Sequence, residues 1–380
     1  MRKVVQQTAR LHVAASANDP DMLYAVGFQV PDPFIFLERG SQQEIVLDDL
    51  ELDRGRRVSR VRKVSSLSYF RKAWKKAYPT RGEPQFEDLL EFFLKTRAIS
   101  KVVVPGSFPA KLIQRLNQAK IGWSVEEGLF FPARETKSNE EVNRVREILK
   151  VTEAGIERAF EILEACQIKR TTQALHWGNS PLTSEKLRFE MELVALAHGA
   201  QAEGTIVAGG LQACDPHERG SGPLHANELI ILDFFPRSSS TGYYGDLTRT
   251  VVRGRASEAQ RKQWHAVLQA QQVALSLIKP GIQGSTVHEK VKQEFQDQGY
   301  ATQRKNGRWQ GFFHGTGHGL GLELHEPPRL AKTEFRPGQI FTVEPGLYYP
   351  EVGGVRHEDV VLVDQTGVEL LSGLEKPLEL

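Results

Sequence analysis

The feature of this sequence with the clearest chemical potential is a glycine-rich histidine segment, HGTGHGLGLELHE, at residues 314–326. His314, His318 and His325 are separated by four and seven positions, and four glycines occupy alternate positions among them. Glycine at this density lets the backbone approach a cofactor or substrate closely. The phosphate-loop pattern G-x-x-x-x-G-K-[ST] is absent from the segment. Alone, the segment is equally typical of a core or surface feature, and it indicates a metal and substrate site only together with carboxylates elsewhere.

Four acids in two similar expected hairpins provide those carboxylates. The hairpins carry Asp233 (in strand 228–235), Asp246 (243–252), Glu344 (339–349) and Glu358 (355–363). Apolar alternation assigns the acids to buried or half-buried faces. An ionised carboxylate taken out of water costs several kcal/mol unless it is paired or bound to a cation. Two cations about 3.5–4 Å apart fit between neighbouring strands. The pattern therefore predicts a dinuclear metal site with a nitrogen ligand from the histidine segment; the alternative is four surface acids on edge strands.

The donor set indicates which metal to expect. Four carboxylates and one imidazole form a hard, oxygen-rich site, whereas Zn²⁺ prefers tetrahedral nitrogen and sulfur donors. We therefore expect two divalent ions, with Mn²⁺ favoured and Co²⁺, Fe²⁺ or Zn²⁺ as alternatives. Such a pair would lower the pKa of a bridging water and make hydroxide available for attack on a carbonyl.

The first third of the chain alternates expected strands and helices, which is typical of a small α/β domain. Apolar runs predict strands at 22–28, 33–39, 43–49 and 100–106, and helical spacing predicts helices at 86–96 and 109–119.

A boundary is expected near residues 130–138, where the sequence becomes polar and carries a capping box formed by Ser138 and Glu141. We therefore predict domains at 1–132 and 133–380. Helix, helix and strands then follow one another twice between residues 138 and 363. This order indicates an α+β fold with a duplicated unit rather than a doubly wound parallel sheet.

Bulk composition is that of an ordinary soluble protein. A length of 380 residues favours two domains, and a net charge of +2 provides no global field for nucleic acid or anionic membranes. Two cysteines, no apolar run long enough for a membrane span and no signal-peptide pattern predict a cytoplasmic protein. The basic stretch RGRRVSRVRK at 54–63 is interpreted as a solvated surface segment, with a nucleic-acid patch as the alternative.

At this point the sequence resembles a known family. The set of Asp233, Asp246, His318, Glu344 and Glu358 is similar to that of the dinuclear metallopeptidases with the pita-bread fold. These include methionine aminopeptidase, Xaa-Pro aminopeptidase and Xaa-Pro dipeptidase (prolidase). The motifs DLTRT, HGTGHGLGLELHE, EPGLYYP and VRHEDVVLV resemble the proline-directed branch. DMLYAVGF resembles its N-terminal creatinase/prolidase-like domain, so the resemblance covers nearly the whole chain.

The resemblance implies a role for each matching residue. Asp233 would chelate one ion, Asp246 and Glu358 would bridge both, and His318 and Glu344 would bind the other. Glu344 is also a candidate proton shuttle. The remaining implied roles are support of the site by Arg356, substrate contact near the scissile bond by His217, a proline-ring pocket lined by His314, and stabilisation of the tetrahedral intermediate by His325.

The implied activity is metal-dependent hydrolysis on the N-terminal side of proline, as an Xaa-Pro dipeptidase or aminopeptidase acting on small peptides through a hydroxide activated by two metal ions. A homodimer is expected by the same analogy. Phe312, Phe313, Tyr348 and Tyr349 could supply an apolar pocket for the proline ring. Phe234 and Phe235 follow Asp233 where the family has smaller residues, and the turn to Asp246 is long. Two alternatives therefore stay open: hydrolysis of a non-proline dipeptide or another C–N bond, and a non-catalytic binding protein that retains the fold.

Overall fold

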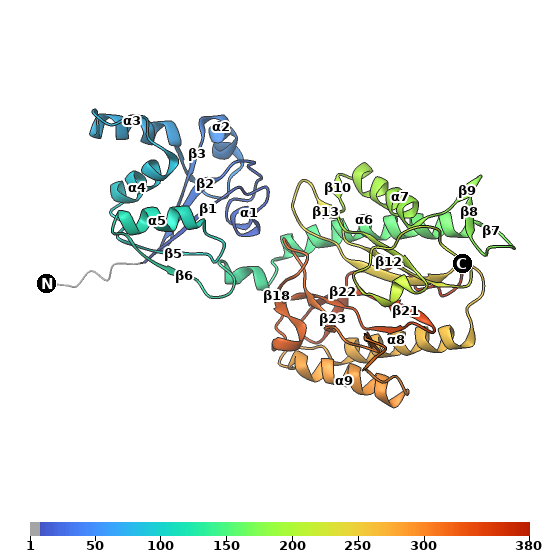
Figure 1. Ribbon diagram of the computed structural model, residues 1–380. Coiled ribbons are helices and arrows are strands. Elements are labelled where there is room, and N and C mark those ends of the chain that lie inside the picture. Colours follow the sequence, from blue (N-terminus) through green and yellow to red (C-terminus); the bar gives the residue numbers. More distant parts are fainter. Residues whose placement is uncertain (1–7) are drawn as a thin grey trace. The chain divides into compact units, whose positions relative to one another are not determined.

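The computed structural model describes residues 8–380 (Figure 1), and the chain divides into two compact units. The first unit reaches Arg134, and the second spans Glu135–Leu380. Each unit has hydrophobic clusters of its own. Within the described residues, none of the helices combines the length and apolar character that crossing a bilayer requires.

A six-stranded mixed sheet, ordered β4-β3-β2-β1-β5-β6, forms the centre of the first unit. Antiparallel pairs join β1, β2 and β3, and parallel pairs add β4, β5 and β6. The strands are β1 (Ala9–Ala14), β2 (Phe34–Arg39), β3 (Gln42–Leu47), β4 (Lys63–Ser66), β5 (Lys101–Val104) and β6 (Gly122–Val125). The helices are α1 (Pro20–Val26), α2 (Asp49–Val58), α3 (Leu67–Ala77), α4 (Phe86–Thr96) and α5 (Ala110–Gln118).

Apolar side chains cover both faces of this sheet. Ile35 and Leu37 belong to the cluster that includes residues of α4 and α5, whereas Phe34 and Phe36 belong to the cluster that includes residues of α1. Successive residues of a strand point to opposite faces, so β2 contributes to two cores. This is the small α/β fold that the sequence predicts.

One expected strand of this unit is wrong: residues 22–28 lie largely in helix α1. Asp19 caps the helix by accepting a hydrogen bond from the Met22 backbone N–H at 2.7 Å, and Pro20 occupies the first turn. Gly27 ends the helix in the left-handed region at a φ of 76°. These are standard start and stop signals, and they override the strand-like composition of the short apolar run.

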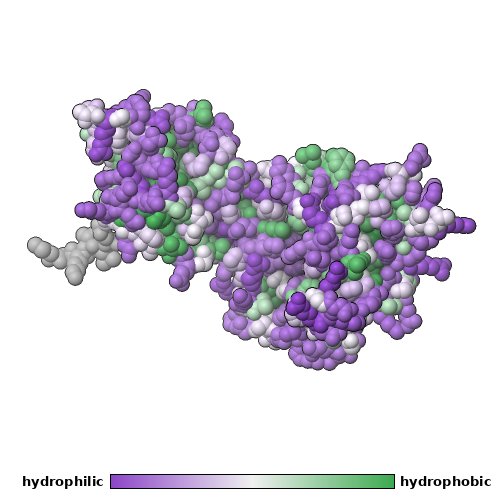
Figure 2. Space-filling view, viewed as in Figure 1, coloured by the Kyte–Doolittle hydropathy of each residue, from purple (hydrophilic) through white to green (hydrophobic). Residues whose placement is uncertain are grey.

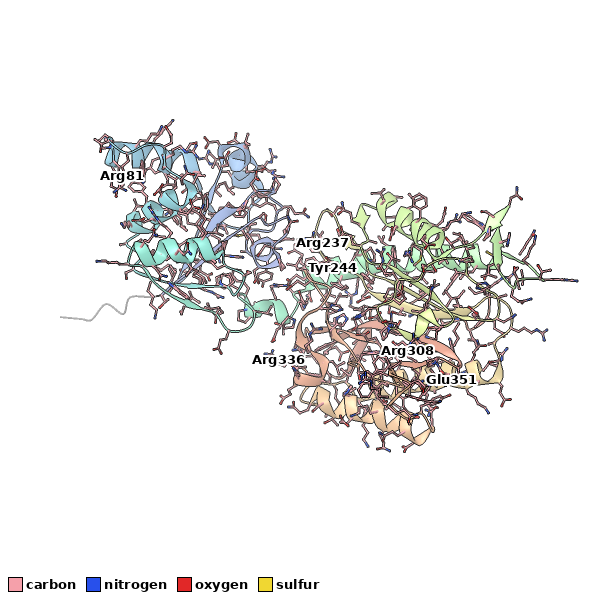
Figure 3. The ribbon with its side chains drawn as sticks, viewed as in Figure 1. Arg81, Arg237, Tyr244, Arg308, Arg336 and Glu351 are labelled. Atoms are coloured by element: carbon pink, nitrogen blue, oxygen red, sulfur yellow. The ribbon has the colours of Figure 1, made fainter. Side chains whose placement is uncertain are left out.

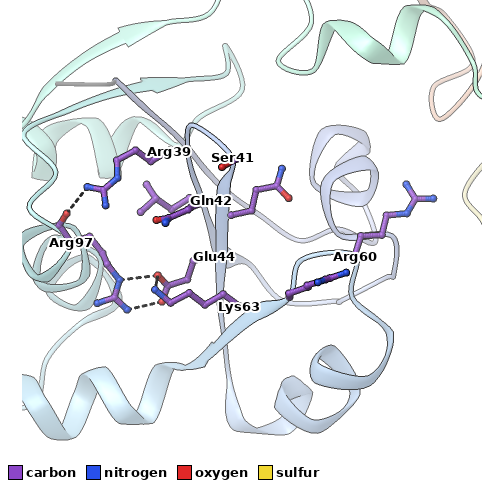
Figure 4. Close-up of a pocket in the computed structure, with 10 residues that line it drawn as sticks. Arg39, Ser41, Gln42, Glu44, Arg60, Lys63 and Arg97 are labelled. Atoms are coloured by element: carbon purple, nitrogen blue, oxygen red, sulfur yellow. Dashed lines mark hydrogen bonds and ion pairs between the residues drawn. The ribbon is translucent and has the colours of Figure 1, made fainter. Parts of the chain in front are cut away.

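The basic stretch 54–63 covers the end of α2 and the loop to β4, and all six of its basic side chains are exposed. Arg60 and Lys63 contribute to the lining of a cavity of about 530 Å³ (Figure 4). Glu44 in its lining accepts two hydrogen bonds from Arg97 at 2.8 and 2.6 Å and pairs with Lys63 at 2.9 Å. The high exposure agrees with a solvated surface segment.

The second unit contains two long helix pairs and several short sheets. The helices are α6 (Asn139–Glu164), α7 (Ser184–Ala197), α8 (Glu258–Leu277) and α9 (Gly284–Asp297), with 3-10 turns η1 (Pro132–Glu135), η2 (Gln212–Cys214) and η3 (Leu330–Lys332). The principal strands are β11 (Ile206–Gly209), β12 (Leu229–Phe234), β14 (Leu247–Val252), β17 (His318–Gly319), β19 (Ile340–Val343), β20 (Gly346–Tyr349), β21 (Gly353–Arg356) and β22 (Asp359–Val363). Short strands complete the unit: β7 (Gln167–Ile168), β8 (Leu175–Trp177), β9 (Ser180–Pro181), β10 (Ala200–Gln201), β13 (Arg237–Ser238), β15 (Gln303–Lys305), β16 (Arg308–Gln310), β18 (Glu326–Arg329) and β23 (Val368–Leu370).

The expected duplication is visible in the strand order. Strands β11-β12-β14 form one antiparallel sheet after α6 and α7, and β17-β19-β22 form the centre of another after α8 and α9. Figure 1 shows the strands lying between the two helix pairs. The halves meet where β14 and β22 approach, because the Glu358 backbone N–H donates to the Thr248 carbonyl at 3.1 Å.

Helix α7 buries one side and exposes an apolar strip on the other. Leu187 and Met191 are buried, whereas Phe189, Leu193 and Leu196 are exposed and form part of the apolar surface over α7 in Figure 2. Contiguous apolar surface on a helix is typical of a contact with another molecule.

Two long strands expected in the second half, 339–349 and 355–363, are each broken. Strand β19 ends at Val343, and β20 starts after Glu344 and Pro345; β21 and β22 are separated by His357 and Glu358. Proline has no N–H for a strand ladder, which explains the first break. Glu344 and Glu358 are therefore in irregular backbone between strands rather than on a regular alternating face.

Helix α8 supplies the hydrogen bonds that these breaks need. The buried Gln271 amide donates to the Val343 carbonyl at 2.9 Å and the His357 carbonyl at 3.2 Å, directly before the two glutamates. Two turns earlier, the buried Gln263 donates to the carbonyls of Leu347 and Gly353 at 3.0 and 2.8 Å. Buried carbonyls without partners are costly, so these glutamines hold the irregular backbone in place.

We expect Gln271→Leu to weaken divalent-metal binding about tenfold and to destabilise the protein by about 2 kcal/mol, because two buried carbonyls beside Glu344 and Glu358 lose their donor. Gln263→Leu is the matched control: it removes two similar bonds, but at the β20–β21 hairpin. It should cause a similar loss of stability with a smaller loss of metal affinity, measured by denaturant unfolding and metal titration. Equal metal affinities in the two variants would contradict this role of Gln271.

Candidate metal centre

Three of the expected metal ligands form a compact buried cluster. One ligand atom each from Asp246, His318 and Glu358 lies within 4.8 Å of the other two. His318 Nε2 also lies 3.3 Å from Glu344 Oε1 and 3.8 Å from Asp246 Oδ2. The three acids are thus gathered around one imidazole.

Asp233 enters the site from β12 and is held by Arg356. Arg356 Nη2 donates to Asp233 Oδ2 at 2.6 Å, and both side chains are buried. The other oxygen of Asp233, Oδ1, is buried and has no hydrogen-bond partner within residues 8–380. Asp233 nevertheless interacts electrostatically with Asp246, Glu344 and Glu358. The structure therefore brings all five expected ligands together.

The duplication explains why the acids converge. Asp233 lies in β12 next to its C-terminal end, and Glu344 directly follows the equivalent strand β19. Asp246 and Glu358 directly precede the equivalent strands β14 and β22. Thr248 Oγ1 in β14 donates to Glu358 Oε2 at 2.6 Å, which joins the two halves at the site.

Burial and mutual repulsion raise the pKa of the acids in the metal-free protein. Burial followed by repulsion from neighbouring carboxylates holds the pKa of Asp246 and Glu358 well above the ordinary values. Burial raises the pKa of Glu344 to about 7 and lowers that of His318 to about 3, so this imidazole is neutral at physiological pH. Its lone pair is available to a metal, and carboxylates that are costly to ionise are relieved by cations.

The donor set fits divalent metal ions. Ionised, the four acids carry four negative charges, and within the described residues only the Arg356 guanidinium makes an ion pair with any of them. His318 is neutral, so three negative charges are left uncompensated, more than one divalent ion neutralises. Asp233 Oδ1, which is buried and accepts no hydrogen bond within the described residues, is a further oxygen atom that could bind a metal ion.

Arg356 also links the acids to the expected substrate residues. Its Nη1 donates to Tyr348 Oη at 3.0 Å and to the Pro216 carbonyl at 3.4 Å. Tyr348 Oη in turn lies 2.9 Å from Nε2 of His314. Sequence reasoning assigned Tyr348 to an apolar pocket, but its side chain is fully buried and its hydroxyl is part of this polar network.

His217 and His325 lie near the same network. The His325 ring centroid is 4.3 Å from that of His318. His217 is exposed. Burial lowers the pKa of both His314 and His325; Arg356 lowers that of His314 further, and Arg329 lowers that of His325.

The expected aromatic pocket residues lie in different surroundings. Phe312 is buried in the core, where its ring lies 5.3 Å from that of Phe295, and Tyr349 donates its hydroxyl to the Ala301 carbonyl. Phe313 lines a cavity of about 510 Å³.

The departures that follow Asp233 pack against α6, and the turn to Asp246 also contacts the histidine-rich segment, because the Tyr244 backbone N–H donates to the Gly321 carbonyl at 2.8 Å. Phe234 packs on α6 at Gly155, where an added Cβ would be 2.2 Å from its ring. The long turn to Asp246 contains β13, which pairs with β10, and Tyr243, whose hydroxyl donates to Glu141 of α6 at 2.8 Å. These features belong to the packing of α6 and α7.

A buried ion pair that sequence reasoning missed supports the His325 segment. Lys137 Nζ lies 2.6 Å from Glu326 Oε1, and both side chains are almost fully buried. The other oxygen of Glu326 accepts the Leu322 and Glu323 backbone N–H groups at 3.1 and 3.3 Å. The pair is 189 positions apart in sequence and has no local signal.

Comparison with known proteins agrees with this geometry. The sequence pattern of metallopeptidase family M24 matches residues 143–365, and the chain belongs to that family. An Xaa-Pro dipeptidase of Pyrococcus horikoshii is 29% identical over 304 residues, covering 77% of this chain and 79% of the relative.

Solved structures share the fold over nearly the whole chain. An Xaa-Pro dipeptidase from Bacillus anthracis superposes with a TM-score of 0.81 at 23% identity, covering 98% of this chain and 95% of that one. An X-Pro aminopeptidase from Thermotoga maritima gives 0.79 at 21% identity, covering 98% and 97%. The expected pita-bread fold with a preceding α/β unit is thereby confirmed.

In the metal-free protein we expect stability to fall as pH rises from about 5 to above 7. Asp246, Glu344 and Glu358 have a higher pKa in the folded chain than in the unfolded chain, so the folded state binds more protons in this window and loses its advantage as they dissociate. Divalent ions bind the deprotonated acids, so Mn²⁺ should raise Tm more at about pH 8 than at about pH 5. Calorimetry with EDTA and with Mn²⁺ measures Tm at each pH. A rise of Tm on adding Mn²⁺ that is the same at both pH values would contradict the prediction.

Proposed function

We propose that this chain hydrolyses the peptide bond on the N-terminal side of proline in small peptides, with two divalent metal ions. The observation that carries the proposal is the convergence of three buried carboxylates, the half-buried carboxylate of Glu344 and one neutral imidazole in a metallopeptidase fold. The named activities of the Pyrococcus, Bacillus and Thermotoga proteins support proline as the substrate residue.

Asp233, Asp246, His318, Glu344 and Glu358 would hold the ions, and the oxygen-rich set favours Mn²⁺. Three uncompensated negative charges support two ions rather than one. When bound, the ions would polarise the peptide carbonyl and lower the pKa of water toward neutrality.

Side chains of the protein would transfer the proton to the leaving nitrogen and stabilise the negative charge that develops on the carbonyl oxygen. Glu344, whose Oε1 lies 3.3 Å from His318 Nε2, would be the group that accepts and returns a proton. The nitrogen of an Xaa-Pro bond has no hydrogen and must gain one to leave. His325 would donate to the carbonyl oxygen as it becomes negative, and Arg356 keeps Asp233 oriented.

The alternative of a non-proline substrate is weakened by the position of Phe234 and of the long turn to Asp246, both of which pack against α6. We further propose a cytoplasmic homodimer, supported by the family resemblance, the absence of a disulfide between the free cysteines Cys166 and Cys214, and the exposed apolar strip on α7.

The purified protein with Mn²⁺ should cleave Ala-Pro or Ala-Pro-Ala and leave Ala-Ala largely intact. Asp246→Ala should abolish both turnover and metal binding, because Asp246 lies at the middle of the acid cluster. Asp297→Ala removes an exposed acid at the end of α9 and serves as the control, with both properties unchanged. Peptide hydrolysis followed by chromatography and metal content by elemental analysis provide the readouts. Turnover that survives Asp246→Ala would overturn the proposal.

A further inference from the structure

A short hairpin stands beside the candidate centre. Strands β15 and β16 pair with Lys305 opposite Arg308, and the turn between them is Asn306-Gly307 with φ values of 52° and 80°. This is the two-residue turn that Asn-Gly favours. Lys305 Nζ binds Glu351 at 3.1 Å, in the turn between β20 and β21. Figure 3 labels Arg308 and Glu351 in this region.

The base of the hairpin is joined to the network around Arg356. Gly311 and Tyr348 exchange backbone hydrogen bonds at 3.1 and 3.2 Å, and the Tyr348 hydroxyl contacts both Arg356 and His314. The β-hairpin is held at its base by the Gly311–Tyr348 hydrogen bonds and near its turn by the Lys305–Glu351 ion pair. These contacts restrict the positions of its side chains. The hairpin is therefore a wall of the site region rather than a loose surface loop.

Between this hairpin and the His217 segment lies the cavity of about 510 Å³ that Phe313 borders. Its apolar lining is Leu211, Cys214, Pro216, Trp309, Phe313 and Pro350. Leu211 and Trp309 are 54% and 55% exposed, an unusual amount of apolar surface around one hollow. Volume and lining are those of a small-ligand pocket.

The charged groups of the cavity are not equivalent. Asp215 accepts the His217 backbone N–H at 3.2 Å, and Glu218 accepts the Gly220 backbone N–H at 3.2 Å. Both acids thus stabilise their own loop. The side chain of Arg308 makes no hydrogen bond or ion pair with any residue in the described range 8–380. The cavity therefore offers a guanidinium to an anionic group.

Two lining residues of the cavity, Pro216 and Phe313, contact Arg356 and His314. Pro216 adjoins His217 and accepts from Arg356, and the Phe313 ring lies 5.3 Å from that of Tyr348 and 6.4 Å from that of His314. If His314 lines the pocket for the proline ring, the space beyond it receives whatever follows proline. One further residue extends a peptide by about 3.3–3.6 Å.

We propose that this cavity binds the residue that follows proline in a tripeptide, its apolar walls contacting that residue's side chain and Arg308 pairing with the C-terminal carboxylate. The inference rests on the proposed function and gives it a substrate class: free-acid peptides Xaa-Pro-Yaa with an apolar Yaa. Arg308 is then a specificity-determining residue, because a guanidinium recognises a carboxylate through charge-assisted hydrogen bonds.

The test compares Ala-Pro-Phe with its C-terminal amide, using the full-length Mn²⁺-loaded protein. The wild type should favour the free acid by about tenfold in kcat/KM, the usual value of a charged hydrogen bond at a half-exposed site. It should also cleave Ala-Pro-Phe more efficiently than Ala-Pro. Arg308→Ala should lose the preference for the free acid by raising KM, while cleavage of the amide stays unchanged.

Arg304→Ala is the matched control. Arg304 is an arginine of the same hairpin that is not among the residues lining the cavity, and it donates to the Gly307 carbonyl. It should retain the preference. A preference that persists in Arg308→Ala, or a wild type that favours Ala-Pro, would overturn the inference while the proposed function stands. A wild type that cleaves no Xaa-Pro peptide would instead overturn the proposed function.

Discussion

The electrostatic cost of gathering four carboxylates, three of them buried and one half-buried, governs the second unit. Asp246, Glu344 and Glu358 lie around one neutral imidazole, and Asp233 is paired with a single guanidinium. Burial and repulsion make ionisation unfavourable, as the raised pKa values of Asp246, Glu344 and Glu358 indicate. Protonation or bound cations relieve this cost, so the stability of the fold should depend on both pH and the occupancy of the centre.

The geometry of the acids depends on interrupted strands. A continuous strand would fix side chains in strict alternation, whereas irregular backbone at Glu344 and Glu358 lets them turn toward His318 and β14. The interruption exposes carbonyls that no strand pairs, and Gln271 binds two of them. Arg249 performs a similar function, donating to the carbonyl of Glu358 at 2.6 Å. Polar side chains from helix and strand are thus necessary parts of the metal centre.

The difference between the ligands and the side chains that support them also explains which features could be predicted from the sequence. Residue type and the repeated order of elements were sufficient to select the four acids, and the Ser138 capping box gave the start of α6. His318 was selected among the three histidines of its segment by the family resemblance. The break before Glu358 has no local signal, and Gln271 resembles an ordinary polar position of a surface helix. Their roles arise from contacts between segments more than 70 positions apart. The helix at 20–26 did have start signals in the sequence, the N-cap Asp19 and Pro20 in the first turn. The apolar composition of residues 22–28 nevertheless favoured a strand.

The proposed chemistry and the proposed substrate choice would be carried by separate parts of the second unit. The metal cluster is buried and joined to both halves of the duplication, so almost any change there alters stability as well as reactivity. The hairpin of Arg308 and the loop of His217 are exposed and contribute little to the core. Their side chains can change without disturbing the acids. In a fold whose catalytic groups are so tightly constrained, such a peripheral wall is the part most free to determine which peptides enter.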